Sequence, residues 1–101
     1  MSRVYVLNKG GHDYSAAEHY GQLTYCTDGP LNKHDISQMV RLLSVAFEDS
    51  DPDDYIILTS LSSLCGVACA LFAVKHNKLN LLIYKAGKYY EHHTILSVIE
   101  A

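Results

Sequence analysis

Three short polar segments of this sequence contain the side chains that could do chemistry. Residues 8–15 include two glycines, a lysine, a histidine, an aspartate and a tyrosine; Thr27-Asp28-Gly29 is the second segment, and hydroxyl-rich residues 59–63 are the third. Glycines let a ligand approach the backbone, and hydroxyls at a helix start suit a phosphate or carboxylate. We therefore predict a site for a small anionic ligand, formed by Asn8, Lys9, Gly10, Gly11, His12, Tyr14, Thr27, Asp28, Thr59, Ser60, Ser62 and Ser63.

Within this site, Lys9 is expected to offset negative charge and Tyr14 to stack on a ring of the ligand. The glycine backbone and the serine hydroxyls would donate hydrogen bonds. The structural alternative is that Gly10-Gly11 forms only a turn and that Ser62 or Ser63 only caps a helix. The first segment matches neither the G-x-G-x-x-G fingerprint nor a P-loop, so the residues leave both interpretations open.

His12 and Asp13 are the acid–base candidates if the protein is an enzyme. Nucleophilic catalysis would need a serine of the third segment or Cys65 beside a base, and His12 is the candidate expected nearby. The sequence has no G-x-S-x-G motif. We therefore favour non-catalytic binding, with a phosphoesterase or glycosidase acting on the same class of ligand as the alternative.

The histidines and cysteines do not indicate a metal site or another cofactor. His92 and His93 are adjacent on an expected strand, so they point to opposite faces and cannot chelate as a simple pair. Cys26, Cys65 and Cys69 are odd in number and lack zinc-like spacing. We expect three buried, inert thiols and no metal.

Composition limits the class of protein. The chain has 101 residues, 49% of them hydrophobic, which is enough for one domain spanning residues 1–101. Its net charge is −3, and its eight lysines and arginines form no basic run, which argues against binding a nucleic-acid polymer. Residues 55–74 are nearly uncharged but include serines, a threonine and a glycine, which indicates a buried core and no membrane span. The first residues lack a secretory signal, so we expect a cytoplasmic protein.

Hydrophobic periodicity predicts the elements that position these residues. Ser15 with Glu18 is expected to form a capping box, Asp35 with Gln38 a second one, and Ala86-Gly87 a hairpin turn. The predicted strands are residues 3–8, 23–26, 55–59, 79–84 and 88–93, and the predicted helices are residues 16–20, 36–47 and 64–75.

The order β-α-β-α-β-α-β-β predicts a small three-layer α/β domain of Rossmann or flavodoxin type, with a mostly parallel sheet and an antiparallel last strand. Ligands bind outside the carboxyl ends of such strands, where the three polar segments would meet. The helix over residues 64–75 is apolar on nearly every side, so we expect the sheet to cover one side and a second subunit the other, giving a homo-oligomer.

Several stretches resemble small uncharacterised α/β proteins encoded by bacteriophages: His12-Asp13-Tyr14-Ser15-Ala16-Ala17-Glu18 through Tyr20-Gly21, Thr27-Asp28-Gly29, Asp53-Asp54-Tyr55-Ile56-Ile57-Leu58-Thr59 and Val74-Lys75-His76. Phage proteins of this size include oligomeric sponges that sequester the nucleotide signals of bacterial immunity, and enzymes that degrade them. The resemblance implies an anti-defence protein in the host cytoplasm that binds a nucleotide-derived ligand.

A third hypothesis is an inhibitor that binds a host protein. Tyrosine suits surfaces that are partly buried and partly wet, and Tyr89 and Tyr90 precede an apolar tail, residues 94–101. These residues would form the contact surface. The tail would otherwise dock on its own chain or on another subunit.

Overall fold

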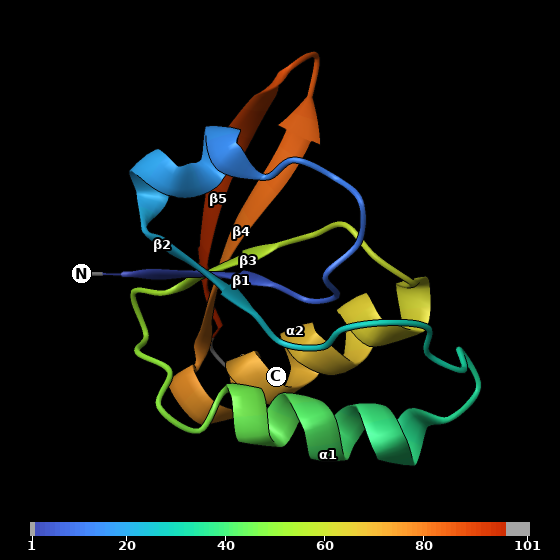
Figure 1. The fold of residues 1–101 in the computed structure, drawn as a ribbon. Coiled ribbons are helices and arrows are strands. Elements are labelled where there is room, and N and C mark those ends of the chain that lie inside the picture. Colours follow the sequence, from blue (N-terminus) through green and yellow to red (C-terminus); the bar gives the residue numbers. More distant parts are fainter. Residues whose placement is uncertain (1, 97–101) are drawn as a thin grey trace.

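A five-stranded mixed sheet organises residues 2–96, the part of the chain that the computed structural model describes. The strand order is β2-β1-β3-β4-β5 (Figure 1). The first four strands are mutually parallel, and β5 is antiparallel to β4, so the predicted α/β class with an antiparallel last strand is confirmed. The strands are β1 (Arg3–Val6), β2 (Gln22–Tyr25), β3 (Tyr55–Ile57), β4 (Lys78–Lys85) and β5 (Lys88–Ile95).

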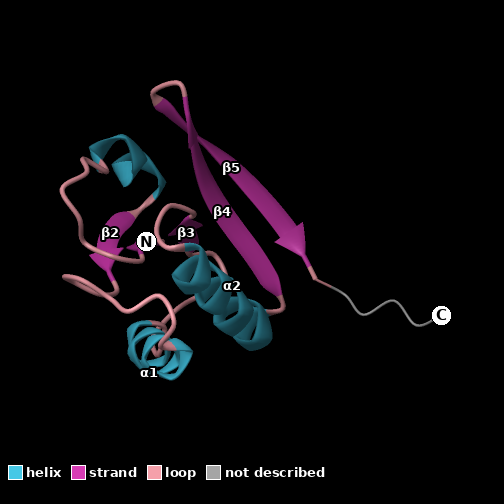
Figure 2. Ribbon diagram, turned by 90° about the vertical axis from the view of Figure 1, so that its right-hand side faces the viewer, coloured by secondary structure: helices cyan, strands magenta, loops and turns pink. Residues whose placement is uncertain are grey.

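The two α-helices, α1 (Ile36–Ala46) and α2 (Ser62–His76), lie side by side on one face of the sheet (Figures 1 and 2). The opposite face is covered by the 3-10 helix η1 (Ser15–Tyr20). The expectation of helices on both faces is thus met only by this single short element. The β4–β5 hairpin projects beyond the other strands of the sheet (Figure 1).

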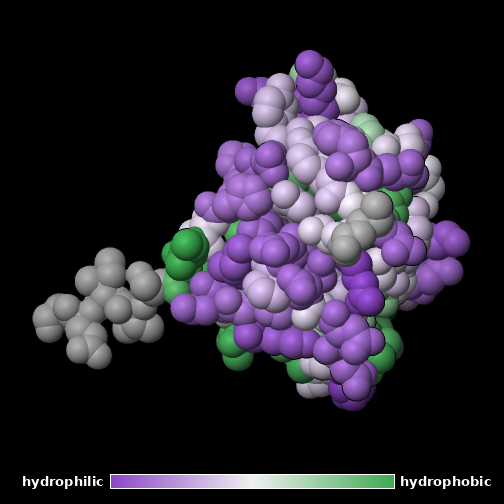
Figure 3. Space-filling model, turned by 90° about the vertical axis from the view of Figure 1, so that its left-hand side faces the viewer, coloured by the Kyte–Doolittle hydropathy of each residue, from purple (hydrophilic) through white to green (hydrophobic). Residues whose placement is uncertain are grey.

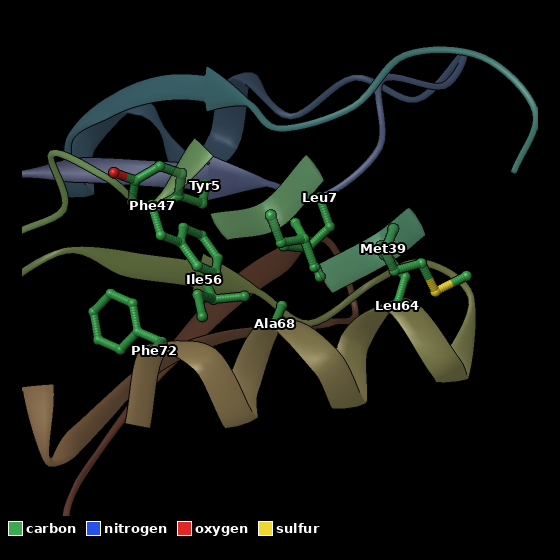
Figure 4. Packing of buried hydrophobic residues seen from close by; sticks show 9 residues of the cluster. Tyr5, Leu7, Met39, Phe47, Ile56, Leu64, Ala68 and Phe72 are labelled. Atoms are coloured by element: carbon green, nitrogen blue, oxygen red, sulfur yellow. The ribbon is translucent and has the colours of Figure 1, made fainter. Parts of the chain in front are cut away.

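Each helix buries one stripe against the sheet. In α2 the stripe is Leu64, Ala68 and Phe72, spaced four residues apart. On the α-helical face, Tyr5 and Phe47 pack edge to face, with ring centroids 4.9 Å apart (Figure 4). Because side chains alternate along β1, its valines join a second cluster, beneath η1. The two clusters therefore pack against opposite faces of the sheet.

α1 covers much of the side of α2 that was expected to need a second subunit. The apolar composition of α2 therefore no longer requires an oligomer. The side of the molecule shown in Figure 3 is mainly hydrophilic, with hydrophobic atoms in separate small patches. Within residues 2–96, no helix is both long and apolar enough to cross a membrane.

The helix starts agree only partly with their predicted caps. Asp35 caps α1, and its Oδ1 accepts a hydrogen bond from the backbone N–H of Gln38 at 3.1 Å, as expected. The predicted Ser15 capping box is wrong: Tyr14 is the N-cap of η1, and no side-chain capping bond forms there. Instead, the N–H of Ser15 donates to Oδ1 of Asp13 at 2.9 Å. A capping box would instead need the Ser15 hydroxyl to accept a hydrogen bond from the backbone N–H of Glu18.

The hairpin turn at Ala86-Gly87 is confirmed. Both residues have positive φ, 51° and 84° respectively, which is the geometry of the two-residue turns that match the twist of paired strands. β4 and β5 pair from Lys85↔Lys88 to Lys78↔Ile95. This pairing places Tyr84 directly opposite Tyr89.

Candidate functional site

A pocket of about 350 Å³ lies at the carboxyl ends of the parallel strands, on the face opposite α1 and α2. One wall comes from the loop after β1, which rises toward the hairpin in Figure 1, and Thr59 follows β3. The other wall is the β4–β5 hairpin. The pocket is lined by His12, Asp13, Tyr14, Thr59, Tyr84 and Tyr89.

Aromatic rings dominate the pocket walls. Tyr14 and Tyr89 are buried, whereas Tyr84 is 58% exposed. The rings of Tyr84 and Tyr89 pack edge to face, with centroids 5.2 Å apart, and those of His12 and Tyr14 are 6.2 Å apart. The pocket thus has a fixed aromatic floor and one exposed ring at its rim, an arrangement suited to a flat ligand.

The charge in the pocket is mainly that of one carboxylate. Hydrogen bonding from Ser15 lowers the pKa of Asp13, so this group is ionised at neutral pH. Burial raises the pKa of both Tyr14 and Tyr89, so their phenols stay protonated. No lysine or arginine is among the described residues that line the pocket. These groups can bind N–H and O–H donors of a ligand more readily than its phosphates.

Lys9 lies apart from the pocket. Its Nζ is 5.6 Å from the centroid of the Tyr25 ring, a cation–π distance, and its backbone N–H donates to the Thr27 carbonyl at 2.8 Å. Lys9 also forms an isolated parallel bridge with Asp28. The first and second polar segments are therefore adjacent, as parallel pairing of β1 and β2 predicts, but their contact is structural.

Asn8 and Thr27 hold these two segments together. The side-chain amide of Asn8 donates to the carbonyl of Gly29 at 3.1 Å. The buried Thr27 hydroxyl lies 2.7 Å from the carbonyl of Leu7 and 3.1 Å from Oδ1 of Asn8. Both side chains are already engaged in hydrogen bonds within the protein. Gly10 and Gly11 are exposed beside them.

The third segment reaches the pocket through Thr59. Ser60 and Ser62 are exposed at the start of α2, whose N-cap, Leu61, offers no side-chain hydrogen bond. The Ser63 hydroxyl is buried and has no hydrogen-bond partner among residues 2–96. Ser60, Ser62 and Ser63 are not among the described residues that line the pocket.

Sequence reasoning missed the role of the hairpin tyrosines. Tyr84 was not singled out, and Tyr89 was grouped with Tyr90 as a protein-contact surface. In the structure Tyr89 is buried toward the pocket, whereas Tyr90 lies on the opposite face of β5 with Ile83, Lys85 and His92. The signal available in the sequence was that Tyr84 and Tyr89 lie equally far from the Ala86-Gly87 turn, which places them opposite each other in the hairpin. Residues 97–101 of the tail lie outside the described residues.

In the part of the chain described, the thiols and metal-ligating side chains form no further reactive or metal-binding site. Cys26, Cys65 and Cys69 are free and partly buried. Burial raises the pKa of all three thiols, that of Cys26 to about 12, so they are poor nucleophiles. Among residues 2–96, no group of three His, Cys, Asp or Glu side chains is placed to hold a metal ion.

The comparisons with known proteins identify a family. Residues 2–95 match the model of the family described as Phage Pam3 gp32-like protein. No curated protein and no solved structure matches the chain. The match covers nearly the whole chain and confirms the resemblance to bacteriophage proteins. This chain belongs to the Phage Pam3 gp32-like protein family.

Proposed function

We propose that the protein binds, without converting it, a small nucleotide-derived ligand whose ring lies in the tyrosine-lined pocket. The observation behind this proposal is the convergence of Tyr14, Tyr84 and Tyr89 around about 350 Å³ at the carboxyl edge of the parallel strands. Open sheets of Rossmann and flavodoxin type bind nucleotides at this edge. The volume is near the lower end of ligand pockets, about 300–1,000 Å³, and suits one nucleotide unit.

The polar groups favour a ring with N–H donors at its edge. The ionised Asp13 carboxylate can accept hydrogen bonds from adjacent N–H groups, such as those of guanine. Thr59 provides a hydroxyl on another side of the pocket. Stacking on a tyrosine contributes about 1–3 kcal/mol per base. Ring recognition therefore provides the main part of the expected affinity.

The phosphate would lie outside the aromatic pocket. A carboxylate and the absence of lysine and arginine from the described lining make the pocket itself unfavourable for an anion. Ser60 and Ser62, exposed at the N-terminus of α2, offer hydroxyls beside backbone N–H groups. In a phage-encoded protein, such binding would sequester a host nucleotide signal. The alternative is an enzyme acting on the same ligand, because His12 and Asp13 line the same pocket.

Mass spectrometry of the purified protein, first native and then denatured, would test for a bound nucleotide. Titration calorimetry with guanosine and adenosine monophosphates would then measure affinity. We expect Tyr84→Ala to weaken binding roughly 5- to 150-fold, the equivalent of one lost stacking contact. Tyr90→Ala is the matched control, because Tyr90 is similarly exposed, at 49%, on the opposite face of the hairpin. It should leave affinity unchanged.

The outcomes separate the hypotheses. An unaltered nucleotide and a loss of affinity specific to Tyr84→Ala would support sequestration. Conversion of the nucleotide, abolished by His12→Ala, would establish the enzyme. Equal effects of the Tyr84 and Tyr90 substitutions would remove the pocket from the explanation.

A further inference from the structure

The outer edge of β5 has a defined set of unpaired backbone groups. β5 is at the edge of the sheet, and its eight residues pair with β4 in one uninterrupted register. The N–H of Leu96 donates to the carbonyl of Asn77 at 3.0 Å. In an antiparallel ladder, hydrogen-bonded pairs alternate along the strand, so even-numbered residues of β5 bond to β4. The N–H and C=O groups of Tyr89, Glu91, His93 and Ile95 therefore point away from the sheet.

This edge has little of the usual protection against strand pairing, because its one carboxylate, Glu91, is already bonded to Tyr55 and His93. Edge strands are commonly short, bulged or interrupted by proline or inward-pointing charge. β5 is longer than the usual five or six residues, and it contains neither proline nor a bulge. Its one lysine, Lys88, lies at the turn. Within residues 2–96 no other strand covers this edge.

We propose that β5 pairs antiparallel with β5 of a second copy, across a two-fold axis at His92. In this register Glu91 faces His93 of the second copy, and Tyr89 faces its Ile95. All four outward-pointing residues of each copy are then paired. The resulting sheet is continuous across the dimer, with ten strands.

Pairing of the Glu91 carboxylate with the His93 imidazole favours this register over its neighbours. A shift of the second copy by two residues toward the turn places two Glu91 carboxylates opposite each other and leaves Ile95 unpaired. The reverse shift places two His93 rings together and moves Tyr89 beyond Ile95, the last residue of β5 in the second copy. In the proposed register the acid and imidazole side chains alternate on one face. Glu91 and His93 already interact within one chain, at 3.0 Å, so their cluster is extended across the axis.

Analytical ultracentrifugation of the whole chain tests the interface. We expect the wild type to form a dimer and Ile95→Pro to weaken it at least about tenfold. Proline removes the outward N–H of this 81% exposed residue and none of the β4–β5 hydrogen bonds. Ile95→Val keeps the N–H and should dimerise normally. A monomeric wild type, or equal dimerisation of Ile95→Pro, would overturn the proposal.

Cysteine cross-linking tests the register. Facing residues at the axis have Cα atoms about 4.5–5.5 Å apart, within disulfide range, so His92→Cys should form a disulfide-linked dimer under mild oxidation. Tyr90→Cys is the control on the same face: its two copies would lie roughly 13 Å apart. The wild type reports background from the three native cysteines. Cross-linking of Tyr90→Cys in preference to His92→Cys would refute the register.

Discussion

Asn80 attaches the pocket hairpin to the rest of the sheet, and we expect Asn80→Ala to be strongly destabilising. The side chain is buried, and its amide nitrogen donates to the carbonyls of Pro52 and Asp54 at 2.7 and 2.9 Å. Its Oδ1 lies 2.8 Å from Nδ1 of His93. Because an amide oxygen only accepts, Nδ1 of His93 must donate. One side chain thereby joins β4 to β5 and to the segment before β3.

The magnitude follows from the three hydrogen bonds. Each contributes about 0.5–1.5 kcal/mol net, and a buried carbonyl left without a partner adds to the loss. We expect Asn80→Ala to lower the free energy of unfolding by about 2–4 kcal/mol. With a urea dependence of about 1–3 kcal/mol per molar for a small domain, the denaturation midpoint should fall by roughly 1–3 M.

Urea unfolding followed by circular dichroism measures this change. Asn32→Ala is the matched control: the Asn32 side chain accepts one local hydrogen bond, from the N–H of His34 at 2.9 Å, and is exposed. Its effect should stay within about 0.5 kcal/mol. If the two alanine variants unfolded at the same urea concentration, the buried network could not be what holds the hairpin.

Two further predictions concern the effect on stability of alanine substitutions at two glycines and the dependence of stability on pH. Gly21→Ala should destabilise the protein by about 1–3 kcal/mol, because the added carbon would lie 2.8 Å from the carbonyl carbon of Ser2. Gly66→Ala should instead stabilise it by about 0.5–1 kcal/mol, since Gly66 is inside α2 and faces open space. Both predictions together would be contradicted if Gly21→Ala and Gly66→Ala shifted the urea midpoint in the same direction. Hydrogen bonds from Tyr55 and then His93 lower the pKa of Glu91. The ionised Glu91 carboxylate therefore stabilises the fold fully above the usual glutamate pKa of about 4.3. This stabilisation is lost as the pH falls through the lowered pKa of the folded protein. The urea midpoint of the wild type should therefore fall more between pH 6 and acid pH than that of Glu91→Gln, and parallel pH profiles would exclude this contribution.

The strands and helices were predictable because they rest on local patterns. Continuous apolar runs marked β1 and β3, and helical spacing with the Asp35 cap marked α1. Ala86-Gly87 indicated the hairpin because a tight turn needs positive φ. These signals lie within a few residues of the elements they define. Their order then limited the sheet to a mostly parallel arrangement.

Long-range polar contacts were not predictable in the same way. In the acidic run before β3, residues 48–54, the buried Asp54 accepts hydrogen bonds from the N–H groups of Arg3 and Asp51, both at 2.8 Å. Asn80 similarly has a partner far along the chain. A sequence records that such residues are polar but not which distant backbone groups they will satisfy.

The predicted site and the observed pocket overlap only in part for the same physical reason. The polar residues following β1 and β2 were expected to face a ligand, but Asn8 and Thr27 use their hydrogen-bonding groups to join their own loops. His12, Tyr14 and Thr59 remain in the pocket, where Tyr84 and Tyr89 complete its wall. Because two tyrosines come from a hairpin that projects beyond the parallel strands, the site depends on strand pairing as much as on loop chemistry. The described lining of the pocket therefore offers aromatic rings and a carboxylate, and Lys9 is not part of it.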